Sequence, residues 1–463
     1  MHNLTAASET PPEHDARRIT FGEALRVWSY IGLNSFGGPA GQIAVMHRVL
    51  VEQRKWVSEA RFLHALNYCM LLPGPEATQL ATYIGWLMHR TPGGIAAGVL
   101  FVLPGFVTIL LLSYVYAAWH EVPAVDAMFR GLGAAVLAVV VEAVLRIGRR
   151  ALANRWMVLI AVVAFIAIHF LETPFPAIIA SAALVGFVGG RLVPQVFLPA
   201  GNGRHGDQVD EGTALDRHDS DHTRPSTARA LRTLAVCLTL WLGPLIALAA
   251  LLGPDDLFVQ VGLFFSKAAV VTFGGAYAVL PYVAQQAVET HGWLTATEML
   301  RGLGLAETTP GPLIQVVQFV GFMAAYNHAG HLPPMLAGTL AAVLTTWVTF
   351  VPCFLWIFLG APYVEAARAN QRLAAALAGV TAAVVGVILN LALWFALHTL
   401  FGQVQEYRAP GVRVLIPEWA TIDPVALAIS GIAFAALFWW RLGMMRTLGL
   451  CAALALAHHV VLG

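Results

Sequence analysis

Charged residues are scarce in this chain of 463 residues, and their scarcity excludes an ordinary soluble protein. Asp, Glu, Lys and Arg make up 11% of the sequence, whereas a soluble domain carries about 25%. Hydrophobic residues make up 58%, and the mean hydropathy is +0.70. The net charge is +1, so no overall positive field points to nucleic acid as a partner. The composition predicts an all-α polytopic membrane protein embedded in the lipid bilayer.

Lysine and cysteine are also scarce, which argues against several kinds of site. The two lysines are Lys55 and Lys267, and neither stands in a Walker A sequence, so the chain is not an ATP-driven pump by itself. No His-Glu-x-x-His motif is present, and we expect no enzymatic activity, cofactor or metal site. The cysteines form no metal-ligand cluster and fall in apolar segments: Cys69, Cys237, Cys353 and Cys451.

Two proline-glycine-proline sequences interrupt apolar stretches and divide the chain into two similar halves. Pro73-Gly74-Pro75 lies downstream of Phe36-Gly37-Gly38, and Pro310-Gly311-Pro312 lies downstream of Phe273-Gly274-Gly275. Both motifs recur after 237 positions, from 36 to 273 and from 73 to 310. A gapless match over about 40 residues predicts an internal duplication. Further pairs fit the same offset: Trp56 with Trp293, and Glu52 with Glu289.

The duplication continues beyond these motifs after an insertion of 11 residues. Pro104 then corresponds to Pro352 and Gly131 to Gly379, at an offset of 248. The half-helices beside each Pro-Gly-Pro break have roughly a dozen residues and are too short to span a bilayer alone. We predict about nine full spans and four broken or re-entrant hairpins whose depth the sequence leaves open.

Composition divides the chain into four parts. Residues 1–20 are polar and predict a disordered N-terminal tail, and residues 21–198 form the first repeat. Residues 199–227 are rich in Gly, Asp and His and predict a polar, flexible cytoplasmic linker. Residues 228–463 contain a linking span and the second repeat.

The distribution of basic residues predicts that the two repeats have opposite orientations. Residues 47–61 contain four lysines and arginines, whereas the equivalent residues 284–298 contain none. Because cytoplasmic loops are enriched in Lys and Arg, these loops are predicted on opposite sides of the membrane. The tail and linker would be cytoplasmic and the C-terminus outside. Such inverted repeats are typical of alternating-access transporters.

The helix breaks are the predicted binding site. Helix N-termini carry free backbone donors and partial positive charge, and they bind anions. The alternative is that the breaks only shape packing and that nearby polar groups only join helices. The proposed binding residues beside the breaks are Gly37, Gly38, Gly74, Thr78, Gln79, Gly274, Gly275, Gly311 and Gln315, and the helix-breaking residues are Pro39, Pro73, Pro75, Pro310 and Pro312.

Three charged residues are candidates for a role in transport. Lys267 lies in an apolar run and is predicted either to face the substrate anion or to snorkel to the interface. Glu76 follows Pro75, where it is predicted either to couple or gate transport by protonation or only to stabilise a helix N-terminus. Glu307 is a weaker coupling candidate. Leu313 replaces Glu76 in the second copy, so the halves differ in charge.

These motifs together resemble the chromate ion transporter family in its long, two-domain form. The resemblance covers nearly the whole chain outside the tail and linker. It implies efflux of chromate across the inner membrane, driven by the proton-motive force or ion gradients, and chromate resistance. The matching stretches are Ser35-Phe36-Gly37-Gly38-Pro39, Lys55-Trp56-Val57, Leu72-Pro73-Gly74-Pro75-Glu76-Ala77-Thr78-Gln79-Leu80-Ala81, Thr272-Phe273-Gly274-Gly275-Ala276-Tyr277 and Thr309-Pro310-Gly311-Pro312.

We therefore predict a secondary active transporter that exports chromate from the cytoplasm. Sulfate, a tetrahedral dianion of similar shape, is the expected competitor. A sulfate or related oxyanion permease is the nearest alternative, and an intramembrane enzyme is a more distant one. The sequence leaves the oligomeric state open, including a homodimer.

Overall fold

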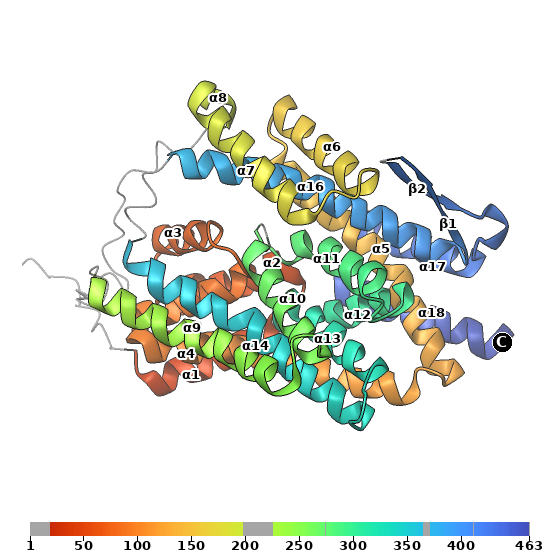
Figure 1. Cartoon of the computed structure of the whole chain (residues 1–463), viewed down its shortest axis with the longest axis horizontal. Helices are drawn as coiled ribbons and strands as arrows, with labels where there is room; N and C mark the ends of the chain where they lie inside the picture. The colour runs from red at the N-terminus through yellow and green to blue at the C-terminus, as the bar shows by residue number, and fades with distance from the viewer. Residues whose placement is uncertain (1–18, 198–225, 274, 364–370, 411, 463) are drawn as a thin grey trace, which may run out of the picture.

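The computed structural model describes residues 19–197, 226–273, 275–363, 371–410 and 412–462. Most of these residues are helical, and the long helices run along the long axis of the molecule (Figure 1). Within the described ranges, seven helices are long and apolar enough to cross a membrane. The predicted class of all-α polytopic membrane protein is thereby confirmed. Most of the predicted tail and linker lies outside the described residues.

The first repeat consists of two broken hairpins followed by longer helices. The hairpins are α1 (Phe21–Asn34) with α2 (Gly38–His47) and the π-helix η1 (Arg48–Gln53), then α3 (Glu59–Cys69) with α4 (Glu76–Trp119). The remaining helices are α5 (Pro123–Ala151), α6 (Arg155–His169), α7 (Phe175–Leu192) and α8 (Pro194–Phe197). His89 and Arg90 have non-helical backbone angles, so α4 is a half-helix joined to a full span at a kink.

The second repeat has the same order after the linking helix α9 (Thr227–Leu252). Its hairpins are α10 (Leu257–Val271) with α11 (Ala276–Ala284) and the π-helix η3 (Gln285–Thr290), then α12 (Ala296–Thr308) with η4 (Leu313–Gln315) and α13 (Val316–Asn327). The rest comprises α14 (Pro334–Gly360), η5 (Ala361–Tyr363), α16 (Gln371–Leu400), β1 (Val404–Ala409), β2 (Val412–Pro417), η6 (Trp419–Thr421), α17 (Pro424–Phe434), η7 (Ala435–Trp439) and α18 (Met444–Leu462).

The nine predicted spans correspond to helices of the structure. Seven are the long apolar helices, and the other two are the shorter α6 and the combined α17 and η7. The hairpin β1–β2, with Val404 opposite Pro417 and Ala409 opposite Val412, was not predicted. Its sequence signal was two runs rich in strand-forming residues separated by Pro410 and Gly411, a spacing typical of a tight hairpin.

The structure repeats backbone detail at the offset found in the sequence. The π-helices η1 and η3 occupy equivalent positions, which begin at 48 and 285. The Trp56 amide donates to the Leu50 carbonyl at 2.8 Å, and the equivalent Trp293 amide donates to the Ala287 carbonyl at 2.8 Å. Ser58 and Thr295, again equivalent, are the N-caps of α3 and α12. The two hairpin regions therefore fold alike.

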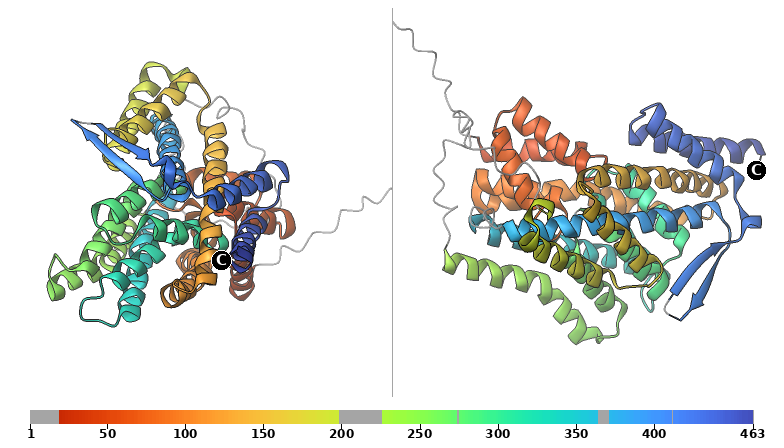
Figure 2. Two further views of the ribbon diagram at one scale, coloured as in Figure 1. Left: turned by 90° about the vertical axis from the view of Figure 1, so that its right-hand side faces the viewer. Right: turned by 90° about the horizontal axis from the view of Figure 1, so that it is seen from above.

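The two repeats point in opposite directions along the molecule. Glu52 of η1 shares a cavity with Thr381, whereas its equivalent Glu289 shares another with Trp394. Thr381 and Trp394 both belong to α16 and are separated by about 20 Å along its axis. We call the two ends the linker end, where α8 stops and α9 begins, and the hairpin end, which carries β1–β2 (Figures 1 and 2).

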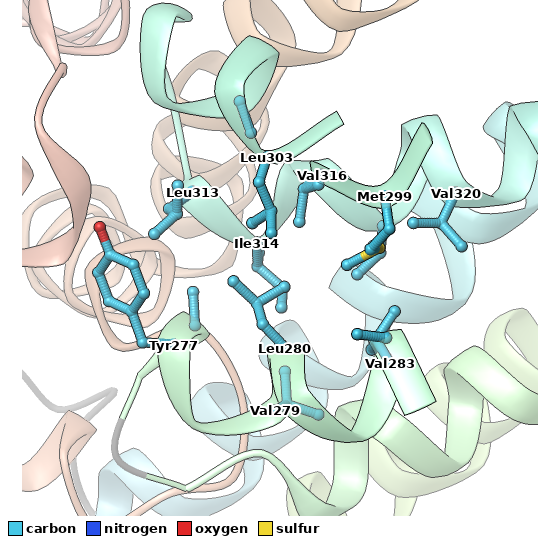
Figure 3. Packing of buried hydrophobic residues seen from close by; sticks show 14 of the residues in the cluster. Tyr277, Val279, Leu280, Val283, Met299, Leu303, Leu313, Ile314, Val316 and Val320 are labelled. Atoms are coloured by element: carbon cyan, nitrogen blue, oxygen red, sulfur yellow. The ribbon is translucent and has the colours of Figure 1, made fainter. Parts of the chain in front are cut away.

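A packed core supports the broken segments of the second repeat. Side chains of α11 face those of α12, η4 and α13 (Figure 3). They are almost fully buried, as at Leu280 and Val320, which are both 0% exposed. Lipid tails are as apolar as leucine, so close packing rather than exclusion of water holds such helices together in a membrane. This packing fixes the position of the second Pro-Gly-Pro break.

Candidate functional site

One backbone hydrogen bond ties each Pro-Gly-Pro break to the opposite repeat. The Gly74 amide donates to the Thr272 carbonyl at 2.7 Å, and the Gly311 amide donates to the Ser35 carbonyl at 2.8 Å. Donors and acceptors are both related by the offset of 237. Ser35 and Thr272 precede the two Phe-Gly-Gly sequences, so all four helix breaks meet at one place between the repeats.

Gly74 and Gly311 are required by the geometry of these breaks. Their φ angles are +119° and +94°, in a region that residues with a side chain rarely occupy. A Cβ on Gly311 would lie 3.1 Å from the backbone Cα of Gly105. A Cβ on Gly74 would lie 3.0 Å from the Gln79 amide nitrogen. Backbone atoms therefore limit the space beside Gly311, whereas side-chain atoms limit the space beside Gly74.

Glutamine amides donate to backbone carbonyls that the helix breaks leave without a helical partner. Gln79 Nε2 donates to the Pro73 carbonyl at 2.7 Å, and Gln42 Nε2 donates to the Gly311 carbonyl at 2.6 Å. Gln315 Nε2 donates to Gln318 Oε1 at 2.8 Å. The amide donors of Gln79 and Gln315 are thus engaged within the protein. Among the residues that the structure describes, the buried side-chain oxygens without a hydrogen-bond partner include Thr78 Oγ1, Gln79 Oε1 and Gln315 Oε1.

Two carboxylates flank the breaks. Glu76 begins α4, and its Oε1 lies 3.3 Å from where a Cβ on Gly275 would be, so it reaches the opposite repeat. Glu307 is 2% exposed, and its Oε1 accepts a hydrogen bond from the Tyr277 hydroxyl at 2.5 Å. Its Oε2 is a buried oxygen without a partner. Tyr277 and Glu76 border the same cavity, whereas Glu307 does not.

The breaks form the inner end of a cavity of about 900 Å³. Pro39, Glu76, Gly275 and Tyr277 line it at the breaks. Arg150, Asn154, Gln195 and Phe197 line it toward the linker end. Of the predicted site residues, Gly274 lies outside the described residues. The cavity thus connects one end of the molecule with the place where the two repeats cross.

Arg146 and Arg150 bring positive charge into this cavity, which also contains the carboxylates of Glu52 and Glu76. They lie one helical turn apart on α5, and both line the cavity. Arg146 is 3.8 Å from Glu142, and Arg150 is exposed. Sequence reasoning used these arginines only to assign the orientation of the chain, because nothing local shows which face of α5 borders a cavity. Guanidinium groups bind tetrahedral oxyanions through charge and paired hydrogen bonds.

The prediction that Lys267 faces the substrate is not supported by its position. Lys267 is exposed on α10 beside Leu263 and Val270, which are 54% and 38% exposed, and it does not line the cavity. These three positions share one helix face, and α9, α13 and α14 pack against the helix elsewhere. The alternative in which the lysine snorkels along an apolar surface agrees with this geometry.

The fold and site define a polytopic helical membrane protein whose cavity ends at crossed helix breaks, an architecture typical of secondary transporters. The chain belongs to the chromate transporter family. The family model described as "Chromate transporter" matches residues 22–187 and 259–457. The resemblance inferred from the motifs is confirmed.

Curated relatives agree with this membership. The chromate transport protein of Pseudomonas aeruginosa is 34% identical over 77% of this chain and 76% of its own length. The chromate transport protein of Cupriavidus metallidurans is 28% identical over 81% of this chain and 82% of its own length. An uncharacterized transporter of Methanocaldococcus jannaschii is 22% identical over 79% and 82%, respectively. No solved structure matches the chain.

Proposed function

We propose that this protein exports chromate across the cytoplasmic membrane as a secondary active transporter and gives chromate resistance. One observation carries the proposal: a cavity lined by Arg146 and Arg150 ends at the crossed helix breaks. Membership of the chromate transporter family supplies the substrate class. The names of the relatives from Pseudomonas aeruginosa and Cupriavidus metallidurans support chromate in particular.

The anion would enter from the linker end and be attracted by the two arginines. At the breaks it would meet helix N-termini, whose backbone donors and partial positive charge favour an anion. The Thr78 hydroxyl, buried without a partner, is able to donate to it. The engaged amides of Gln79 and Gln315 instead hold the breaks in shape.

Coupling to protons would act through Glu76 first and Glu307 second. Glu76 lines the cavity beside Gly275, so its ionised form repels a bound dianion and its protonated form does not. A proton on Glu76 and a bound chromate would therefore favour each other, so occupancy of the site by the anion would depend on the protonation of Glu76. Glu307 lies behind Tyr277 and would respond to the same movement of the repeats.

The transport test is uptake of labelled chromate into inside-out membrane vesicles. We expect energised uptake that falls with a protonophore and with excess sulfate. Arg150→Gln should lower uptake by about tenfold, as expected for loss of a charge-assisted contact. Arg149→Gln is the matched control, because Arg149 is exposed next to it but does not line the cavity. Lys267→Ala should also retain uptake.

The outcomes separate the candidate functions. Uptake of sulfate without chromate would indicate a sulfate or related oxyanion permease. Uptake that falls equally in the Arg149 and Arg150 variants would contradict the proposal that chromate passes through this cavity. Chemical conversion of chromate by the purified protein would replace the transporter by an intramembrane enzyme.

The proposed orientation places the linker end in the cytoplasm. Single cysteines at the equivalent, exposed positions Arg54 and His291 test it. The four native cysteines are buried, and replacing them removes any background. We expect a membrane-impermeant thiol reagent to label position 291 from outside and position 54 only from the cytoplasmic side. Labelling of both from one side would contradict the inverted orientation.

A further inference from the structure

A second, very small cavity lies at the hairpin end and corresponds to the large one. Its volume is about 30 Å³, room for about one water molecule. Several of its lining residues are the repeat equivalents of residues that line the large cavity. The pairs are Pro281 with Ala44, Ala284 with His47 and Glu289 with Glu52 at the offset of 237, and Trp394 with Arg146 at the offset of 248. The structure thus contains corresponding cavities at its two ends, one wide and one narrow.

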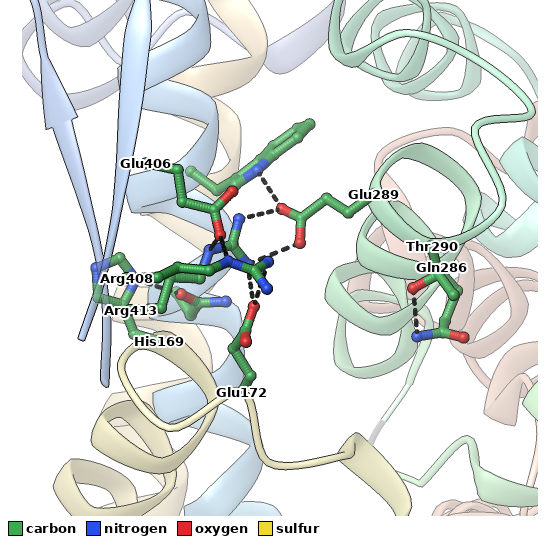
Figure 4. Close-up of polar contacts among 10 residues, drawn as sticks. His169, Glu172, Gln286, Glu289, Thr290, Glu406, Arg408 and Arg413 are labelled. Atoms are coloured by element: carbon green, nitrogen blue, oxygen red, sulfur yellow. Dashed lines mark hydrogen bonds and ion pairs between the residues drawn. The ribbon is translucent and has the colours of Figure 1, made fainter. Parts of the chain in front are cut away.

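Arg413 lines the small cavity and lies among several carboxylates (Figure 4). Its two terminal nitrogens donate to the Glu289 carboxylate at 2.7 and 2.9 Å. It also lies 3.3 Å from Glu172 and 3.1 Å from Glu406. Trp394 Nε1 donates to the same Glu289 carboxylate at 3.1 Å. We call these residues, Glu172, Glu289, Trp394, Glu406 and Arg413, the latch.

The latch joins parts of the chain that are far apart in sequence. Glu289 belongs to the π-helix η3, Glu172 to the turn after α6, and Arg413 to β2. The Arg413 amide also donates to the Phe170 carbonyl at 2.8 Å, which fixes the hairpin over this turn. Burial lowers the pKa of Arg413, but the Glu289 hydrogen bonds and the surrounding carboxylates outweigh it and raise the pKa. The side chain is 10% exposed and stays charged.

At the linker end, the equivalent residues Glu52 and Arg146 pair with other residues. Glu52 has a side chain that is 59% exposed, and it contacts His47 at 3.1 Å. Arg146 is 31% exposed, and its ion-pair partner is Glu142 at 3.8 Å. Both line the wide cavity. Glu52 and Glu289 each lie in a π-helix, a local form that is often found at functional sites.

We propose that the Glu289–Arg413 pair latches a gate at the hairpin end, and that Glu52 and Arg146 form the reciprocal latch when the linker end closes. This inference rests on the proposed function, because it requires a protein that alternates between two open states. In a transporter built from inverted repeats, the two repeats exchange conformations when the protein changes state. The first repeat then takes the conformation that the second repeat has in this structure. Glu52 then reaches Arg146 as Glu289 now reaches Trp394.

Two single-cysteine reporters test the gate in membranes, in a background without the native cysteines. Ala44 is exposed in the wide cavity, and Ala284 is buried in the small one. In the parent, we expect Ala44→Cys to react quickly with a thiol reagent and Ala284→Cys slowly. Adding Arg413→Gln should speed labelling at position 284 by about tenfold and slow it at position 44, since a charge-assisted pair is lost. Arg408→Gln is the matched control, because Arg408 pairs with Glu172 and Glu406 but not with Glu289.

Two further variants separate a gate from local damage. The conservative variant Arg413→Lys keeps a positive charge beside Glu289, Glu172 and Glu406, so labelling at position 284 should stay slow. Glu52→Gln added to Arg413→Gln should also slow it again, since the opposite state loses its own latch. Equal effects of Arg413→Gln and Arg408→Gln, or faster labelling at both reporter positions, would overturn the proposal.

Labelling requires no chromate, so it is independent of the substrate assignment. Reciprocal labelling in vesicles that do not move chromate would support the gates and refute the proposed substrate. Chromate uptake without reciprocal labelling would refute the gates alone.

Discussion

The two Pro-Gly-Pro breaks share a backbone arrangement but differ in the charges beside it. Gly74 and Gly311 each donate to the opposite repeat at nearly the same distance, 2.7 and 2.8 Å. Glu76 follows the first break where Leu313 follows the second, and Glu307 precedes the second where Met70 precedes the first. The duplication therefore supplies the scaffold twice, whereas each carboxylate occurs at one break. Four predictions test how far the two copies are equivalent.

The largest expected effect is at the glycines. Gly311→Ala should lower the free energy of unfolding by about 3 kcal/mol, because its φ is unfavourable and its Cβ would meet the backbone of Gly105. Gly74→Ala should lower the free energy of unfolding by less, because its Cβ would contact the side chains of Gln79 and Cys353, which are able to move. Thermal melting of the purified protein in detergent measures both. Gly133→Ala, in open space, is the control, and equal melting of all three variants would refute the comparison.

The next effect concerns Glu307. Tyr277→Phe removes the hydrogen bond to this buried carboxylate and should cost about 2 kcal/mol. Tyr326→Phe, which loses a bond to the Ala117 carbonyl at 3.2 Å, should cost about 1 kcal/mol. Melting temperatures of the two variants give the comparison. The Tyr277→Phe cost should shrink when Glu307→Gln is also present, and strictly additive effects would show that the pair is not coupled.

Glu76 should control the response to a proton gradient. Glu76→Gln fixes a neutral side chain, so we expect uptake that no longer changes when a pH difference is imposed across vesicles, a loss of about tenfold in stimulation. The experiment compares chromate uptake with and without the gradient. Glu121→Gln, an exposed carboxylate at the far end of α4, should keep the stimulation. Stimulation that survives Glu76→Gln would direct attention to Glu307.

The smallest effect distinguishes two equivalent helix caps. Thr295 and Glu298 form a reciprocal capping box on α12, whereas Ser58 caps α3 alone. Thr295→Ala should therefore cost about 1 kcal/mol and Ser58→Ala somewhat less. Melting in detergent detects the difference. A larger loss of stability for Ser58→Ala would indicate that the α3 cap contributes more to the stability of the folded protein than the α12 cap.

Local residues explain why much of the architecture was predictable. Proline removes a backbone donor and glycine permits positive φ, so the breaks at Gly74 and Gly311 follow from their own sequence. The hairpin β1–β2 also had a local signal, the Pro410-Gly411 sequence between two runs of strand-forming residues, but this signal is weak beside long apolar runs. The positions of Lys267 and Arg150 had no such signal, because the face that a helix turns toward a cavity depends on its neighbours.

The sequence by itself determined the membrane class, the duplication, the helix breaks and the family, because composition, spacing and backbone chemistry are properties of the chain. Only the tertiary structure decided that the breaks cross between repeats, that Arg146 and Arg150 line the cavity, and that Lys267 does not. It also decided that the cavity at the hairpin end is narrow and lined by Arg413 while the cavity at the linker end is wide. These facts depend on packing between residues hundreds of positions apart, which no local pattern encodes.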